Sequence, residues 1–335
     1  MGLRIGIPRA LWYYTHFPFW RTFLESLGAQ VVLSSPTSRD ILNAGVEETV
    51  SEACVPIKVY LGHVWALVNK WERQEIDALF LPRYVSWCNH TVYCPKFLGL
   101  PDIVRSSFTT LPPLVEVRID RRRPFALLAA CNQIRCQLGA PFSALFRAYH
   151  QAMESQRLHE QRQLAGWDPL DSIAGRQRVH SEHTSADTAT EKPIRLALLG
   201  YPYLVYDRYV NLGLLDKLRA IGVQVFTTES VPLRYLNQQK QLFTKRLFWT
   251  YSDLVARAGY YFLNNGQPLV DGIIHVTAFG CGPDAMVDKL LELAARRYKL
   301  PFLPVTLDEH TGAAGITTRL EAFVDMLDRR RRAIC

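Results

Sequence analysis

The sequence predicts an α/β protein with two lobes, each built around a parallel sheet. Short apolar segments such as Gln30–Ser34 alternate with helical stretches of about 11 to 16 residues, a rhythm typical of βαβ units. The rhythm stops after the first third of the chain and starts again near Ile194. A length of 335 residues also suits two domains of about 150 residues each.

The first lobe is expected to span residues 1–123. Its first predicted helix ends at Gly28, Ser38 opens the second, and Pro56 is tolerated in the first turn of the third. Pro82-Arg83 is expected to end the third strand. The predicted strands are 4–8, 30–34 and 76–81, and the predicted helices are 17–27, 38–53 and 56–70.

The remainder is expected to form three parts. Residues 124–166 have apolar positions at helical spacing, and Gly139-Ala140-Pro141 should break them into two helices. Residues 167–193 are polar and without periodicity, which predicts a linker or flexible loop. Residues 194–335 form the second lobe, with strands at 194–199, 223–227, 272–276 and 301–306 and helices at 211–220, within 248–263, at 285–298 and at 319–330.

Composition and charge exclude several classes. The net charge of +8 comes largely from Arg121–Arg123 and Arg329–Arg332, which we interpret as solvated basic clusters because no DNA-binding motif accompanies them. No apolar run reaches the roughly 18 to 20 residues that span a bilayer, and Met1–Arg9 resembles a strand rather than a secretion signal. We therefore expect a cytoplasmic protein that binds neither nucleic acid nor membrane.

Cysteine chemistry is the main functional signal. A cytoplasmic chain with 7 cysteines and no CxxC pair would have to assemble any metal site from separate loops. Cys94 follows the third predicted strand, Cys281 lies between a strand and a helix, and Cys54 lies between two helices. Helix N-termini favour a thiolate. Spacing alone leaves two interpretations, namely a three-cysteine metal site and three buried thiols.

The neighbours of these cysteines suit a bulky cofactor. Gly280 and Gly282 flank Cys281 and would let the backbone approach such a group closely. Pro95 follows Cys94, as proline follows a ligand cysteine in ferredoxin motifs. The cysteine pair of residues 131 and 136 lies on a predicted helix, and we expect both side chains to belong to the core.

Several long motifs resemble one known family. They are Ile5-Gly6-Ile7-Pro8-Arg9-Ala10-Leu11, Glu52-Ala53-Cys54-Val55-Pro56-Ile57-Lys58, Gly62-His63-Val64, the segment from Tyr93 to Pro101, Phe279-Gly280-Cys281-Gly282-Pro283-Asp284, Asp308-Glu309-His310-Thr311-Gly312-Ala313 and Thr318-Arg319-Leu320-Glu321-Ala322-Phe323. Together they resemble the DUF2229 family, proteins related to activators and components of 2-hydroxyacyl-CoA dehydratases.

The resemblance implies two Rossmann-like (flavodoxin-like) lobes with an iron–sulfur cluster in the cleft between them. The implied ligands are Cys54, Cys94 and Cys281, holding a [4Fe-4S]-type cluster or one cubane of a larger or double-cubane cluster. The implied work is low-potential electron transfer, or an ATP-coupled reductive step on a small-molecule substrate such as an acyl-CoA. A separate ATPase activator or electron donor would supply the electron, because the chain has no GxxxxGK[ST] motif of its own.

Other assignments stay open. Glu52, Glu309 and His310 are candidates to move protons at the cluster, although capping or hydrogen-bonding roles explain them equally well. Cys88 is either a further ligand or a bystander. The rival functions are a two-lobed binding or scaffold protein without a redox cluster, and a zinc protein in which His63 joins the three cysteines. The helices of residues 124–164 are a candidate homodimer interface.

Overall fold

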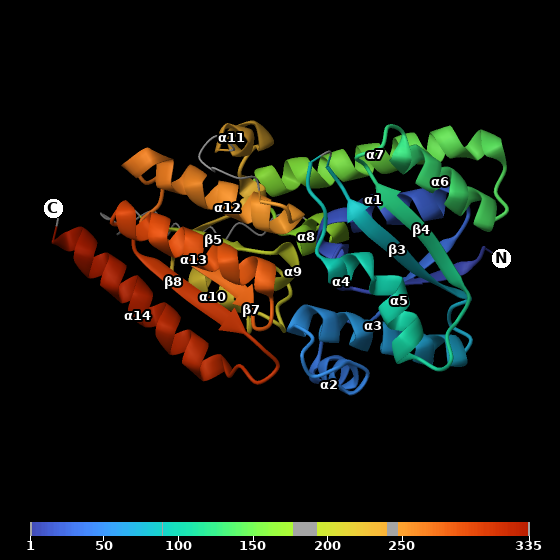
Figure 1. Ribbon diagram of the computed structural model, residues 1–335, viewed down its shortest axis with the longest axis horizontal. Helices are drawn as coiled ribbons and strands as arrows, with labels where there is room; N and C mark the ends of the chain where they lie inside the picture. Colours follow the sequence, from blue (N-terminus) through green and yellow to red (C-terminus); the bar gives the residue numbers. More distant parts are fainter. Residues whose placement is uncertain (1, 89, 177–192, 240–246, 334–335) are drawn as a thin grey trace. The chain divides into compact units, whose positions relative to one another are not determined.

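The computed structural model describes residues 2–88, 90–176, 193–239 and 247–333, and strands and helices alternate along both halves of the chain (Figure 1). The chain divides into two compact units, which we call unit 1 (Met1–Gln161 and Leu247–Tyr251) and unit 2 (Arg162–Arg246 and Ser252–Cys335). Each unit contains one four-stranded parallel sheet. The predicted α/β class with two parallel sheets is therefore confirmed.

The sheet of unit 1 has the strand order β2-β1-β3-β4, the order of a flavodoxin-like sheet. In its register, Ile5 lies opposite both Val31 and Ala78. Ile5 and Leu79 are completely buried, as expected for parallel strands covered on both faces. The strands are β1 (Arg4–Ile7), β2 (Gln30–Leu33), β3 (Ala78–Ser86) and β4 (Leu114–Asp120).

The helices of unit 1 pack on this sheet and on one another. Helix α6 packs on β4, α1 on β2, and α4 and α5 on β3, while α2 packs on α3. The predicted pair of helices after residue 124 is confirmed as α6 and α7, with the break at residues 138–141. The bounds are α1 (Tyr13–Ser26), α2 (Arg39–Glu47), α3 (Val55–Glu72), α4 (Pro95–Leu98), α5 (Leu100–Ser107), α6 (Ala126–Gln137) and α7 (Phe142–Leu164).

Two features of this sheet differ from the prediction. Strand β4 was not predicted, and β3 continues through Pro82 to Ser86 instead of ending there. Beyond Leu79, β3 pairs only with β4, because its pairing with β1 stops at Gly6–Leu79. A proline at position 82 is tolerated because one side of the strand has no partner there.

The sheet of unit 2 repeats the same topology, in the order β6-β5-β7-β8. Its strands are β5 (Arg195–Gly200), β6 (Gln224–Thr227), β7 (Gly272–Ala278) and β8 (Phe302–Leu307). Its helical elements are α8 (Pro169–Ala174), α9 (Pro202–Val205), α10 (Leu214–Ala220), η1 (Thr228–Ser230), α11 (Leu233–Gln238), α12 (Thr250–Leu263), η3 (Asn264–Gly266), α13 (Gly282–Arg297) and α14 (Ala313–Arg332). Of the expected linker, residues 169–174 form α8, whereas residues 177–192 lie outside the described part.

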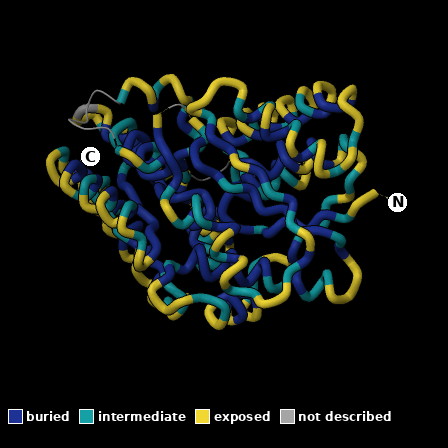
Figure 2. Tube along the Cα trace, turned by 45° about the vertical axis from the view of Figure 1, so that its right-hand side comes forward, coloured by how far each residue is buried: buried dark blue, intermediate teal, exposed yellow. Residues whose placement is uncertain are grey.

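Burial follows the sheets. Strands β3 and β7 are buried over nearly their whole length, whereas the exposed positions gather on the outer sides of the helices and on the loops (Figure 2). Within the described residues, no helix is both long enough and apolar enough to cross a membrane. In each parallel sheet the carboxyl ends of the strands meet at one edge, where ligands bind in open α/β sheets.

Candidate functional site

Cys54 is the N-cap of α3, with extended backbone angles of φ −66° and ψ 149° and a proline in the first helical turn. Its thiol does not cap the helix, so the sulfur is not used to satisfy an amide of the first turn. The side chain is half-buried. A buried lysine on the same helix, Lys58, donates from Nζ to the carbonyl oxygen of Ser51 (3.1 Å) and so ties the preceding loop to α3.

Cys94 is the N-cap of α4 and has nearly the same backbone conformation, φ −61° and ψ 158°. Pro95 is the first helical residue, where it presets the helical φ at a position that needs no amide. Burial raises the pKa of the Cys94 thiol, the amide of Phe97 opposes that rise, and the proximity of Cys54 adds to it. Cys54 and Cys94 are therefore close enough to interact electrostatically within unit 1.

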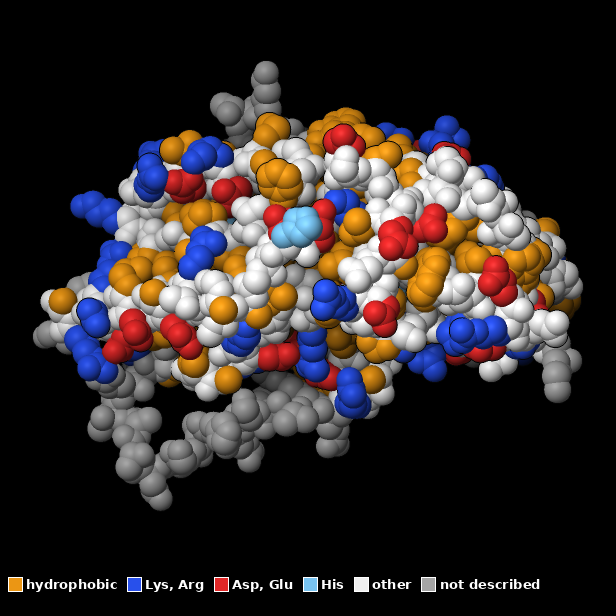
Figure 3. All heavy atoms as spheres, turned by 90° about the horizontal axis from the view of Figure 1, so that it is seen from below, with side chains coloured by type: hydrophobic (Ala, Val, Ile, Leu, Met, Phe, Trp, Pro, Cys, Tyr) orange, Lys and Arg blue, Asp and Glu red, His pale blue; other side chains and the backbone are white. Residues whose placement is uncertain are grey.

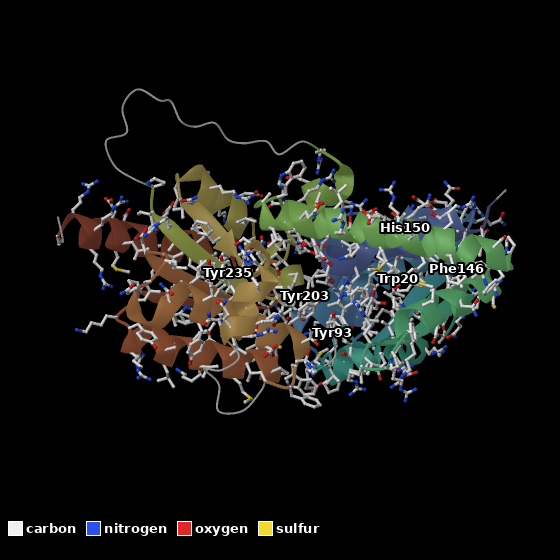
Figure 4. All side chains as sticks on the ribbon, turned by 90° about the horizontal axis from the view of Figure 1, so that it is seen from above. Trp20, Tyr93, Phe146, His150, Tyr203 and Tyr235 are labelled. Atoms are coloured by element: carbon white, nitrogen blue, oxygen red, sulfur yellow. The ribbon has the colours of Figure 1, made fainter. Side chains whose placement is uncertain are left out.

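The loop before Cys94 is fixed by aromatic packing. Tyr93 is buried, and its ring stacks on Phe97 (centroids 5.2 Å apart) and meets Tyr251 edge to face at the same separation. Its hydroxyl is hydrogen-bonded to Nε2 of His16 at 3.0 Å. Figure 4 labels Tyr93 among the side chains of unit 1. These contacts hold Cys94 in a defined position rather than on an unrestrained loop.

Cys281 has the corresponding place in unit 2, as the N-cap of α13 directly after β7. Gly280 has φ +75°, a left-handed conformation that favours glycine, so the turn itself explains this residue. A Cβ at Gly282 would meet no atom within 4 Å, which leaves room beside the helix start. Gly282, one of the two glycines expected to admit a cofactor, therefore borders open space.

The three predicted proton-moving residues lie near these turns but differ in character. Glu52 is exposed, and its own backbone amide and the Ser51 hydroxyl lower its pKa, so it is ionised and a poor proton donor near neutral pH. His310 is exposed and Glu309 half-buried, in the loop after β8. That loop is organised by Asp308, which accepts from the His310 amide (2.9 Å) and the Thr311 hydroxyl (2.7 Å).

The Cys281 turn and the 308–311 loop share one sheet edge. Ala278 pairs with Leu307 in the β7–β8 register, and the amide of Phe279 donates to the carbonyl oxygen of Leu307 (2.9 Å). Cys281 and Glu309 thus follow neighbouring strands of unit 2 within three residues of the last paired position. Parallel pairing of β7 and β8 brings these two segments to the same edge of the sheet.

No three side chains of the His, Cys, Asp or Glu type gather into a metal-binding group within the described residues. Cys88 in particular does not complete a set with Cys54 and Cys94. It is exposed, and its Sγ lies 2.8 Å from the Thr91 hydroxyl.

His63 is not available as a zinc ligand in this structure. His63 is completely buried, with Nδ1 bonded to the Ser34 hydroxyl (2.9 Å) and Nε2 bonded to the Thr37 hydroxyl (3.0 Å). Both ring nitrogens are therefore engaged, and burial lowers the pKa of His63 to about 3. His63 is a structural core residue that joins α3 to the segment after β2.

The two cysteines of α6 differ from each other, contrary to the prediction that both belong to the core. Cys131 is completely buried, and burial raises the pKa of its thiol, whereas Cys136 is exposed and accepts from Nη2 of Arg135 (2.9 Å). Five residues turn a helix by about 140°, so one residue faces the sheet and the other faces solvent. Cys335 lies outside the described residues.

Sequence reasoning missed one ionic cluster in unit 2. His275, inside the apolar strand β7, lies between Asp284 and Asp288 of α13. The only signal was a histidine within an otherwise apolar strand, and no local pattern pairs it with carboxylates of the following helix.

The surface seen in Figure 3 supports the interpretation of the basic clusters. Lysine and arginine side chains are interspersed with aspartate and glutamate on that face rather than gathered in one field. Many arginines are also paired, for example Arg122 with Asp120 (2.8 Å) and Arg332 with Asp328 (2.9 Å). Interspersed and paired charges are typical of solvated surfaces.

Comparison with known proteins gives one informative match. The family model described as the CoA enzyme activase uncharacterised domain (DUF2229) matches residues 4–231, which include Cys54 and Cys94 but not Cys281. No curated protein matches the chain. Among solved structures, the glycosyltransferase SnogD from Streptomyces nogalater is similar at 11% identity and a TM-score of 0.26, over 95% of this chain and 84% of that one.

Proposed function

This chain belongs to the CoA enzyme activase uncharacterised domain family, whose model matches residues 4–231. We propose that it is an iron–sulfur protein that takes part in reactions of CoA thioesters. In this proposal it acts as a reductase or dehydratase-like component. A separate ATPase or other electron donor supplies its electron, and its substrate is a small molecule.

The observation that carries the proposal is the proximity of Cys54 and Cys94 within unit 1. The two residues are far apart in sequence, yet each is the N-cap of a helix and their thiols interact electrostatically. The Cys54 thiol does not cap α3, and the backbone amides of Phe97 and Lys96 lower the pKa of the Cys94 thiol and so favour its thiolate. The positive end of a helix dipole and the amides of the first turn stabilise a thiolate, the form that binds iron.

Cys281 is the third ligand in this proposal. It has the same position at a helix N-terminus, and the open space beside Gly282 suits a bulky group. With three protein thiolates, a [4Fe-4S] cluster keeps one iron for water, a substrate or a bridging sulfide. Such a cluster supplies one-electron transfer at low potential.

The chain's own residues have separate tasks in the proposal. Tyr93 and Phe97 hold the Cys94 turn in place, and Lys58 ties the loop before Cys54 to α3. Glu309 and His310, at the same sheet edge as Cys281, are the candidates to hold or deliver a proton. Glu52 is the weakest of the three candidates, because its lowered pKa disfavours both release and uptake of a proton near neutral pH.

The competing function is a binding or scaffold protein without a redox cluster. It is favoured by the absence of a three-residue metal-binding group among the described residues. A structural zinc site that uses His63 is not proposed, because both nitrogens of His63 bond to hydroxyls.

Iron and acid-labile sulfide per chain, measured after anaerobic purification, distinguish these functions. We expect about four of each in the wild type and a loss in Cys54→Ala, Cys94→Ala and Cys281→Ala. Cys136→Ala, at an exposed thiol on α6, is the matched control and should keep its iron.

The other outcomes are equally informative. About eight irons would indicate a double cluster and make Cys88→Ala the next variant. Negligible iron in anaerobic wild-type protein would overturn the proposal in favour of a binding protein.

A further inference from the structure

The ionic cluster of unit 2 lies between β7 and the first two turns of α13. His275 is completely buried in β7, and its Nδ1 lies 2.8 Å from Oδ1 of Asp288. Its Nε2 lies 3.4 Å from Oδ1 of Asp284, which is also completely buried. Asp284 and Asp288 are four residues apart on α13, so they project from the same face of the helix toward the strand.

The protonated form of His275 is the one that satisfies this arrangement. Neither carboxylate oxygen of Asp284 has a hydrogen-bond partner within the described residues. An ionised carboxylate buried without a partner is very unfavourable, and an opposite charge compensates it. A neutral imidazole has one N–H group, whereas an imidazolium has two, so it can donate from Nδ1 to Asp288 while its charge lies at ion-pair distance from Asp284.

The electrostatics of the cluster agree with this protonation state. Burial by itself would lower the pKa of His275, but the charges of Asp284 and Asp288 outweigh it and raise the pKa to about 9. The ring of Phe302 in β8, 6.4 Å away between centroids, also lies beside His275 and carries no charge. His275 is therefore positively charged at neutral pH.

The position of Asp284 links this cluster to Cys281. Cys281 is the N-cap of α13 and Asp284 is the third residue of that helix, so both belong to its first turn. We propose that His275 is a positioning residue for Cys281, because its imidazolium, held between Asp284 and Asp288, fixes the first turn of α13 on β7.

This role deepens the proposed function, because it concerns the turn that carries the proposed third ligand. The positioning itself requires only the protein chain. It can therefore be tested on metal-free protein, where failure of the cluster proposal has no effect on the result.

The test measures the rate at which N-ethylmaleimide alkylates Cys281 in the full metal-free chain, read by mass spectrometry of the peptides. Cys88, an exposed thiol of unit 1, serves as the internal reference. His275→Gln removes the charge and should raise the Cys281 rate about tenfold while the Cys88 rate stays unchanged. The matched control is Lys289→Ala, at an exposed residue of α13 that pairs with Glu292, and it should leave both rates unchanged.

A second variant covers the case in which His275→Gln does not fold. Asp288→Asn keeps a hydrogen-bond acceptor for Nδ1 but removes one of the two charges, and its side chain is 20% exposed, so the helix tolerates the change. Asp288→Asn should raise the alkylation rate of Cys281 by a smaller factor than His275→Gln does. It should also speed hydrogen exchange of the backbone amides in the first turn of α13. An unchanged Cys281 rate in folded His275→Gln, or an equal rise at Cys88, would overturn the proposal.

Discussion

Gly62 of α3 lies directly against the carbonyl oxygen of Ile41 in α2, so that a Cβ at this position would be 1.8 Å from that oxygen. The contact is reciprocal, because a Cβ at Gly45 of α2 would lie 1.8 Å from the carbonyl oxygen of Lys58. The two helices thus cross with their backbones in contact. This crossing sets the position of α3 and therefore of Cys54, the N-cap of that helix.

We expect Gly62→Ala to destabilise the protein by about 3 kcal/mol or more, because backbone atoms rather than flexible side chains must move. Urea unfolding measures the change in free energy. The control is Gly315→Ala in α14, where a Cβ meets nothing within 4 Å, and there alanine should be neutral or stabilising by up to about 1 kcal/mol. Equal stability of Gly62→Ala and the wild type would show that α2 and α3 do not pack this closely.

Acid sensitivity should arise from His63. Burial lowers its pKa to about 3, so the folded protein keeps it neutral while the unfolded chain binds a proton near pH 6.5. Stability is therefore lost as the pH falls from about 6.5 toward 3, by about 1.4 kcal/mol per pH unit for this residue. Urea unfolding of the wild type and His63→Gln between pH 7 and pH 4 should show a shallower loss in the variant. Parallel pH profiles would contradict a neutral, buried His63.

Alkaline sensitivity should arise from His275, with the opposite sign. Its folded pKa of about 9 lies above the unfolded value, so its contribution is fully present below about pH 6.5 and is lost as the pH rises through 9. The stability difference between the wild type and His275→Gln should therefore shrink from pH 7 to pH 10. A difference that is constant over this range would mean that His275 is neutral in the folded protein.

The local part of this structure could be predicted from the sequence. Pro95 and Pro283 mark helix starts, so the placement of Cys94 and Cys281 before helices follows from short-range signals. The two parallel sheets follow from the alternation of apolar strands with helices. The break at residues 138–141 follows from the glycine and proline there.

The tertiary part could not be predicted in the same way. In β4, Glu116 and Arg118 alternate with buried Val115 and Val117, a pattern typical of a strand, but the partner strand β3 cannot be read from it. The pairing of His275 with Asp284 has no such signal, because it depends on how α13 packs across β7. The engagement of His63 by Ser34 and Thr37 likewise depends on contacts between distant segments.

The proximity of Cys54 and Cys94 can be tested without any metal. Dibromobimane becomes fluorescent only when it alkylates two neighbouring thiols, so metal-free protein should yield a peptide in which it bridges Cys54 and Cys94. Either Cys54→Ala or Cys94→Ala should abolish the product, and Cys88→Ala should retain it, because Cys88 does not form a group with the other two. Cys131 should stay unmodified in the native protein because it is completely buried. Separate single labelling of Cys54 and Cys94, with no bridged peptide in folded wild-type protein, would show that the two sulfurs do not face a common ligand, and the cluster proposal would lose the observation that carries it.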